Sequence, residues 1–156
     1  MIHTINLIAS RAGNTHSNSL NVLNVLKISN DTEVGSAVPD LTTVDVIELH
    51  FPKFTDGRAY SQAVQLRRRH GYQGDIRATG EVLIDQLAQM QRTGFSTAVL
   101  QDGQDIEHGR KLLAQFNGFY QGDAVHAKPA FAEPALTRPA LAQPVFTQPD
   151  FAKVSA

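Results

Sequence analysis

The sequence predicts one α/β domain whose small parallel sheet is built from successive βα units, followed by a low-complexity tail. Three observations predict this fold class. Glycine followed by an aromatic residue ends three helical segments, at spacings of 23 and then 24 residues. An apolar, strand-like run precedes each segment, and a proline repeat replaces both patterns near residue 128. The length of 156 residues allows one domain with a buried core.

The glycine and aromatic pairs are typical of helix C-caps. Glycine just past a helix adopts the left-handed conformation without steric cost, and the next aromatic ring packs back on the last turn. A repeat of this length is enough for one strand, one helix and two short loops. The pairs are Gly71 with Tyr72, Gly94 with Phe95, and Gly118 with Phe119.

Three strands and three helices follow in order. The strands are predicted at Val44–Phe51, Gly74–Thr79 and Ser96–Gln101, and the helices at Arg58–His70, at Glu81–Thr93 and from Asp105 onward. Apolar residues recur at helical spacing in each helix, and Asp105 is a good N-cap. Crossovers this short are right-handed and connect parallel strands. The helices cover either one face, as in half of a (βα) barrel, or both faces, as in a three-layer sandwich.

The N-terminal flank is less regular. A further parallel strand is predicted within Asn21–Ser29, and the link from there to Val44 is short for a full helix. Residues 1–20 are rich in Asn, Ser and Thr with little periodicity, so we assign no element to them and expect a flexible N-terminus. The α/β domain is therefore placed at residues 21–127.

Residues 128–156 form a tail with proline at every fifth position from Pro129 to Pro149. An apolar residue follows two positions after each proline, and no regular structure gathers these side chains on one face. We therefore expect a disordered tail. Two interpretations of it stay open: a neutral repeat expansion, and a string of weak docking points that gain from multivalency.

Composition excludes several classes of function. A net charge of -1 gives no field broad enough to hold nucleic acid or an anionic membrane. The absence of cysteine excludes disulfides, thiol catalysis and cysteine-bound zinc or iron–sulfur clusters. The histidines lack metal-ligand spacing, and no dinucleotide or P-loop motif is present, so no cofactor is evident. No membrane span or secretion signal is recognisable, which favours the cytoplasm.

Polar residues follow the predicted strands. In open parallel sheets, ligands bind beside the carboxyl ends of the strands, where loops lead into helix N-termini. Lys53, Asp56, Arg58 and Ser61 follow the first of the three strands, and Arg77 belongs to the second. Two arginines and two helix N-termini facing one crevice would suit a small oxyanion or a phosphate.

A purely structural interpretation of the segment HFPKFTDGRAYS, residues 50–61, stays open beside this one. In that interpretation Asp56 and Gly57 form a turn, Asp56 or Thr55 caps the next helix, and Arg58 pairs with a nearby acid such as Asp85. Residue chemistry alone leaves both interpretations open.

Four motifs follow one another along Phe51–Leu100: an FPxFxDGRxYS segment, an LR-rich helix ending in Gly-Tyr, a GDIRATGEVLIDQL segment and a closing Gly-Phe. In these motifs the chain resembles a bacterial family catalogued as domain of unknown function nine-thirty-four. It departs from the family at Ala59, where glycine is frequent. The residues shared with the family motif include Asp56, Gly57, Arg58, Ser61, Arg77, Gly80, Asp85 and Gln86.

The resemblance implies a role in sulfur assimilation, because members of that family are commonly labelled oxidoreductases involved in sulfite reduction. Since the chain has no visible means of holding electrons, we expect an accessory protein of assimilatory sulfite reduction, acting with sulfite reductase or its electron donor. The alternative is a small enzyme or sensor that binds an anionic metabolite at the strand ends. No catalytic residue is assigned, and the candidate ligand-binding residues are Lys53, Asp56, Arg58, Ser61, Arg77, Asp85 and Gln86.

Overall fold

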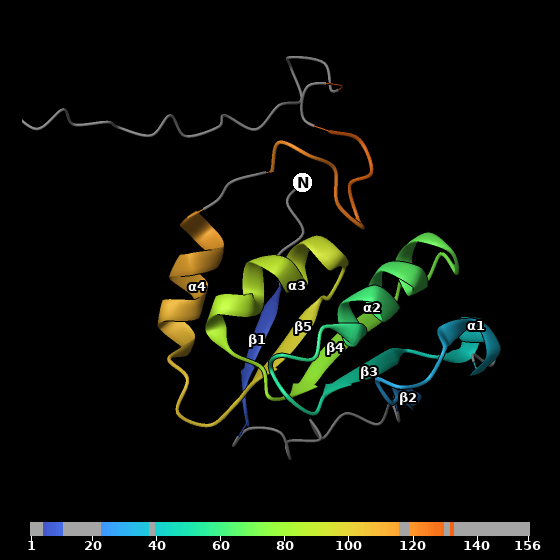
Figure 1. Ribbon diagram of the computed structural model, residues 1–156, viewed down its shortest axis with the longest axis horizontal. Helices are drawn as coiled ribbons and strands as arrows, with labels where there is room; N and C mark the ends of the chain where they lie inside the picture. Colours follow the sequence, from blue (N-terminus) through green and yellow to red (C-terminus); the bar gives the residue numbers. More distant parts are fainter. Residues whose placement is uncertain (1–4, 11–22, 38–39, 116–118, 130–131, 133–156) are drawn as a thin grey trace, which may run out of the picture.

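The computed structural model describes residues 5–10, 23–37, 40–115, 119–129 and 132. Within them, five parallel strands form one sheet in the order β1-β5-β4-β3-β2 (Figure 1). The strands are β1 (Asn6–Ala9), β2 (Val25–Ile28), β3 (Val46–Phe51), β4 (Asp75–Gly80) and β5 (Thr97–Leu100). The helical elements are α1 (Val34–Ala37), η2 (Leu41–Thr43), α2 (Arg58–Arg68), η3 (Ile84–Gln86), α3 (Leu87–Thr93) and α4 (Ile106–Gln115). The predicted α/β domain with a parallel sheet is confirmed.

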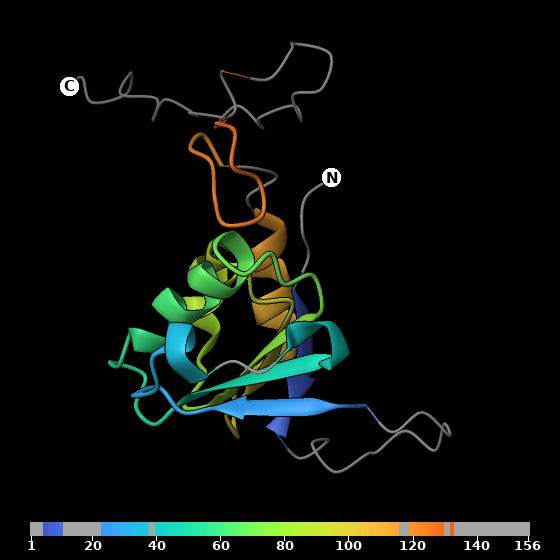
Figure 2. The same cartoon turned by 90° about the vertical axis from the view of Figure 1, so that its right-hand side faces the viewer.

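The helices α2, α3 and α4 lie over one face of the sheet (Figures 1 and 2). Side chains alternate between the two faces of a strand, and Ile47, Leu49 and Phe51 of β3 point to this face and are fully buried. They form one core with helix residues such as Leu66 and Met90. Among the described helices this is the half-barrel-like arrangement, with one covered face, and not the three-layer sandwich.

The opposite face of the sheet carries charged side chains in a row. Strand register places Lys27 of β2 beside Glu48 of β3, and Glu48 beside Arg77 of β4. Glu48 pairs with Lys27 at 3.2 Å and with Arg77 at 3.4 Å, and Arg77 also pairs with Asp75 at 3.3 Å. These four residues therefore form a chain of ion pairs across three strands.

The predicted glycine caps are confirmed for the first two helices. Gly71 and Gly94 have left-handed φ angles of 63° and 101°. The aromatic residues after them, Tyr72 and Phe95, are buried, and the N–H groups of Gly94 and Phe95 donate to carbonyls in the last turn of α3. The third cap includes Gly118, which lies outside the described residues.

The second predicted helix begins later than its apolar spacing indicates. The prediction of a helix over 81–93 is wrong at its start, because residues 81–83 are not helical and η3 begins at Ile84. The N–H of Glu81 donates to the carbonyl of Phe51, and the carbonyl of Val82 accepts from Gln101. This stretch thus bridges the carboxyl ends of β3 and β5. Val82 is buried at a position that fits helical spacing, but it lies in a loop.

The N-terminal flank contributes both edge strands. The strand predicted within Asn21–Ser29 is confirmed as β2, and the link after it contains only the short elements α1 and η2. The strand β1 was not predicted, because residues 6–9 are too few to show a period. Its pairing with β5, distant in sequence, makes it a strand. Residues 1–4 and 11–20, where we expected flexibility, lie outside the described residues.

Residues 119–129 continue the fold beyond α4 at the amino-terminal edge of the sheet. The N–H of Ala124 donates to the carbonyl of Arg92, and Arg68 donates to the carbonyl of Asp123. The guanidinium of Arg92 lies 5.0 Å from the ring centroid of Phe119. Most of the tail predicted at 128–156 lies outside the described residues.

The two glycine caps offer a matched test of packing at the end of α3. Alanine at Gly71 would meet no atom within 4 Å, whereas a Cβ at Gly94 would lie 2.6 Å from Cγ of Arg67. We expect Gly71→Ala to cost about 1 to 2 kcal/mol through its left-handed backbone alone. Gly94→Ala should cost roughly 1 to 3 kcal/mol more, because Arg67 is anchored and cannot yield freely. Urea unfolding of both variants checks this, and equal losses would contradict the steric argument.

Candidate functional site

The loops after β2, β3, β4 and β5 lie at the carboxyl-terminal edge of the parallel sheet. They are acidic: their only cation is Lys53, joined by Arg58 at the first position of α2. The acids in these loops and in η3 are Asp31, Glu33, Asp56, Glu81, Asp85, Asp102 and Asp105. One of them confirms a prediction, because the carboxylate of Asp105 accepts from the N–H groups of Glu107 and His108 and caps α4.

Two side chains from the next loop hold the loop between β3 and α2 in place. The N–H of Phe54 donates to the carboxylate of Glu81 at 3.0 Å, and Nε2 of Gln86 donates to the carbonyl of Phe54 at 2.8 Å. Gln86 is itself oriented by the N–H of Leu83, which donates to Oε1. Both backbone groups of Phe54 are thus bonded to side chains of the β4–α3 connection.

Phe54 is nevertheless 50% exposed. Lys53 beside it is exposed as well. A large aromatic ring held at the surface on an immobilised backbone is a recurrent feature of contact surfaces.

Asp56 links three segments at the same edge. Its carboxylate accepts from Nη2 of Arg58 at 2.7 Å and from Nδ2 of Asn30 at 2.7 Å, and also from the N–H of Arg58. The hydrogen bonds from the Arg58 side chain and N–H lower the pKa of Asp56 to about 2. Arg58 remains 59% exposed on its side chain, and its partner is Asp56 rather than Asp85.

Beneath this loop lies an aromatic cluster. The ring of Tyr60 packs against Phe51 at 5.1 Å and Phe95 at 6.2 Å between centroids, nearly perpendicular to the latter. Burial, with a smaller contribution from the charge of Asp85, raises the pKa of Tyr60 to about 12. Tyr60 therefore stays protonated and supports the loop, while the neighbouring Ser61 and Asp85 are exposed.

Arg77 does not join Arg58 in a crevice. It lies between the buried residues Ile76 and Ala78 in β4, so alternation turns its side chain to the helix-free face. There it pairs with Glu48 and Asp75. Of the seven candidates, the structure brings Lys53, Asp56, Arg58 and Gln86 into or against one loop, leaves Ser61 and Asp85 exposed near it, and places Arg77 elsewhere.

Sequence reasoning missed Asn30, Phe54 and Gln62 at this edge. Gln62 is 5% exposed and donates through Nε2 to the carbonyls of Ser29 and Thr32 at 2.8 Å each, fixing the loop after β2 against α2. The sequence held one indication of this role, because Gln62 is a polar residue on the apolar face of a predicted helix. Asn30 gave no signal, since its partner is distant in sequence.

Within the described residues, no group of three or more His, Asp or Glu side chains is arranged to hold a metal ion. The helices of that part of the chain are also too short or too polar to cross a membrane.

The Asp56 contacts predict an unusual titration. Because the pKa of Asp56 is lowered from 3.8 to about 2, its bonds to Arg58 should persist below pH 3.8 and be lost as the pH falls through about 2. A carbon-detected NMR titration of the carboxyl group measures this. Arg58→Gln should raise the midpoint toward 3.8, and Lys53→Gln is the matched control. A wild-type midpoint near 3.8 would contradict the geometry.

Comparison with known proteins identifies a family. Residues 25–131 match the family described as bacterial protein of unknown function (DUF934). No curated protein and no solved structure shows a significant match. The matched range begins with β2, includes the carboxyl-edge loops and extends past residues 119–129, which is more than half of the chain. The chain therefore belongs to this bacterial family, DUF934.

Proposed function

We propose that the protein is an accessory factor of assimilatory sulfite reduction that binds sulfite reductase or its electron donor through the loop between β3 and α2. The proposal rests on one structural observation, the exposed ring of Phe54 on a backbone fixed by Glu81 and Gln86. The pathway comes from the family resemblance described above.

A fixed loop favours binding because little conformational entropy is lost on association. The two backbone bonds of Phe54 and the contacts of Asp56 with Asn30 and Arg58 order the segment before any partner arrives. An exposed aromatic side chain in such a setting is suited to fill a pocket on a protein surface.

The charge around Phe54 specifies the partner's complementary surface. The carboxyl-edge loops hold many more carboxylates than cations, so a partner with basic residues around an apolar pocket is favoured. We place this encounter in the cytoplasm. The protein has no cysteine with which to carry a cluster, so in this proposal the electrons stay on the partner.

The alternative, an anion site built from Arg58 and Arg77, has weaker support. Arg77 is turned to the other face of the sheet, and Arg58 is already paired with Asp56. The charge of Asp31 also acts on Arg58. A small anion that approaches Arg58 would also approach the carboxylates of Asp56 and Asp31, which would repel it.

The pathway is tested by growth. Deleting the gene should impair growth on sulfate or sulfite as the sulfur source and leave growth on cysteine normal. Restoring the wild-type gene is the control. Normal growth of the deletion strain on sulfate would refute the role in sulfite reduction.

The docking surface is tested by Phe54→Ala. Wild-type protein from cells grown on sulfate should co-purify with the reductase or its electron donor. Phe54→Ala should weaken that binding about thirtyfold, which corresponds to about 2 kcal/mol, with little change in melting temperature because the ring is exposed.

Leu23→Ala is the matched control for this surface, since Leu23 is 54% exposed and does not belong to the carboxyl-edge loops. It should bind as the wild type does. Equal binding by the Phe54 variant and the wild type would exclude this loop as the contact.

A further inference from the structure

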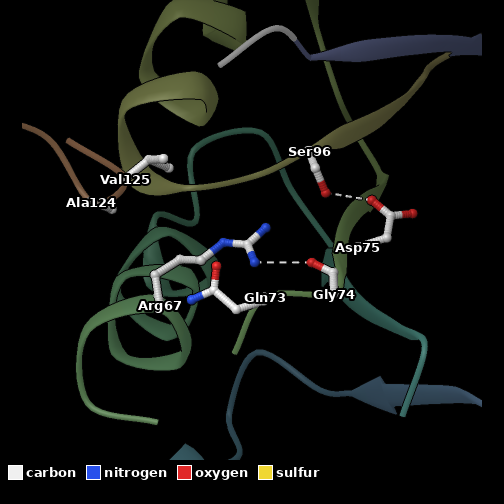
Figure 3. A pocket seen from close by; sticks show the side chains of 7 residues that line it. All are labelled: Arg67, Gln73, Gly74, Asp75, Ser96, Ala124 and Val125. Atoms are coloured by element: carbon white, nitrogen blue, oxygen red, sulfur yellow. Dashed lines mark hydrogen bonds between the residues drawn. The ribbon is translucent and has the colours of Figure 1, made fainter. Parts of the chain in front are cut away.

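A pocket lies at the amino-terminal edge of the sheet, at the opposite end of the strands from the acidic loops. Its volume is about 460 Å³, and it lies between the end of α2, the starts of β4 and β5, and the segment after α4 (Figure 3). Its lining residues are Arg67, Gln73, Gly74, Asp75, Ser96, Ala124 and Val125.

The guanidinium of Arg67 points into this pocket (Figure 3). It is half-buried, and Nε donates to the carbonyl of Gly94 while Nη1 donates to those of Tyr72 and Gly74. These partners are neutral main-chain groups, and among the described residues no carboxylate forms an ion pair with Arg67. Its Nη2 takes part in none of these bonds, so donors remain for a ligand.

The other charge in the lining, on Asp75, is already compensated. One carboxylate oxygen of Asp75 accepts from the hydroxyls of Ser96 and Thr97, and the other accepts from Arg77. Its charge belongs to the chain of ion pairs on the helix-free face, in which two cations match two anions. The charge of Asp75 still acts on Arg67, but no ion pair joins the two side chains, so Arg67 is the cation of the pocket wall that has no carboxylate in contact with it among the described residues.

The residues next to the pocket lining carry both signs, since Asp123 precedes Ala124 and its carbonyl accepts from Arg68. Arg68 and Arg69 follow Arg67 at the end of α2, and both are exposed. Gln73 offers a neutral, exposed carboxamide, and Ala124 and Val125 supply an apolar wall. The half-buried guanidinium lies in a lower dielectric than water, where an anion interacts with it more strongly.

We propose that this pocket binds a small organic anion, whose carboxylate or other oxyanion group takes the free arm of Arg67 and whose body lies against Ala124 and Val125. A pocket of 460 Å³ has room for more than an inorganic ion. The site is separate from the Phe54 surface and does not depend on the proposed function.

The test is an NMR titration of the ¹⁵N-labelled full chain with succinate, and with succinamide as its neutral counterpart. Succinate should cause saturable shifts of the amides of Gly74, Ser96 and Val125, and succinamide should bind at least tenfold more weakly. Sulfate forms a third arm. Equal or tighter binding of sulfate at these amides would refute an organic ligand, while weaker binding supports it.

Charge variants at Gln73 separate ligand binding from the structural role of Arg67, whose removal would release three carbonyls. Gln73→Glu should weaken succinate binding threefold or more, and Gln73→Lys should strengthen it by a similar factor. Gln73 is exposed, so a change in its surface bond from Nε2 to the carbonyl of Gly71 should alter the melting temperature little in either variant.

The proposal would also be overturned by shifts that do not saturate, by equal affinity for succinate and succinamide, or by the same affinity in both Gln73 variants. Shifts centred on the Arg58 loop instead of the pocket would likewise refute it.

Discussion

The sheet is entirely parallel and its described helices pack on one face, and most other features of the molecule depend on this constraint. Parallel strands need a crossover that returns the chain to the same end of the sheet. Each of α2, α3 and α4 therefore begins beside the carboxyl ends of the strands, and α2 and α3 end beside the amino end of the next strand. Two chemically different edges result, separated by the length of the strands.

The same alignment separates the charges. The amino end of a helix favours acidic residues, and its carboxyl end favours basic ones. Asp105 caps α4 at one edge, whereas Arg67, Arg68 and Arg92 occupy the last turns of α2 and α3 at the other. Because the helices point the same way, these local preferences give an acidic carboxyl-terminal edge and place arginines at the amino-terminal edge, where Asp45, Asp75 and Asp123 also lie. A net charge of -1 conceals this asymmetry.

The two edges suit different partners. At the acidic edge Phe54 is half exposed on a loop that Glu81 and Gln86 hold, and this is the surface proposed to contact another protein. At the amino-terminal edge a half-buried Arg67 faces an open pocket, which is the proposed site for a small organic anion. On the helix-free face between these edges, the carboxylates of Glu48 and Asp75 form ion pairs with Lys27 and Arg77, so the charges there balance one another.

Local sequence determined the βα units, because their signals are local. Left-handed glycines, an N-cap aspartate and apolar periods each act within a few residues, and they located β3, β4, β5, α2 and α4. Tertiary structure decided what depends on distant partners. The strand β1 forms because it pairs with β5. Residues 81–83 bridge β3 and β5 instead of starting a helix, and the alternation of side chains along β4 turns Arg77 away from Arg58. Arg67 matched a simple helix end in sequence, and only the packing of residues 119–129 beside it made it the wall of a pocket, because a pocket is defined by segments that meet in space.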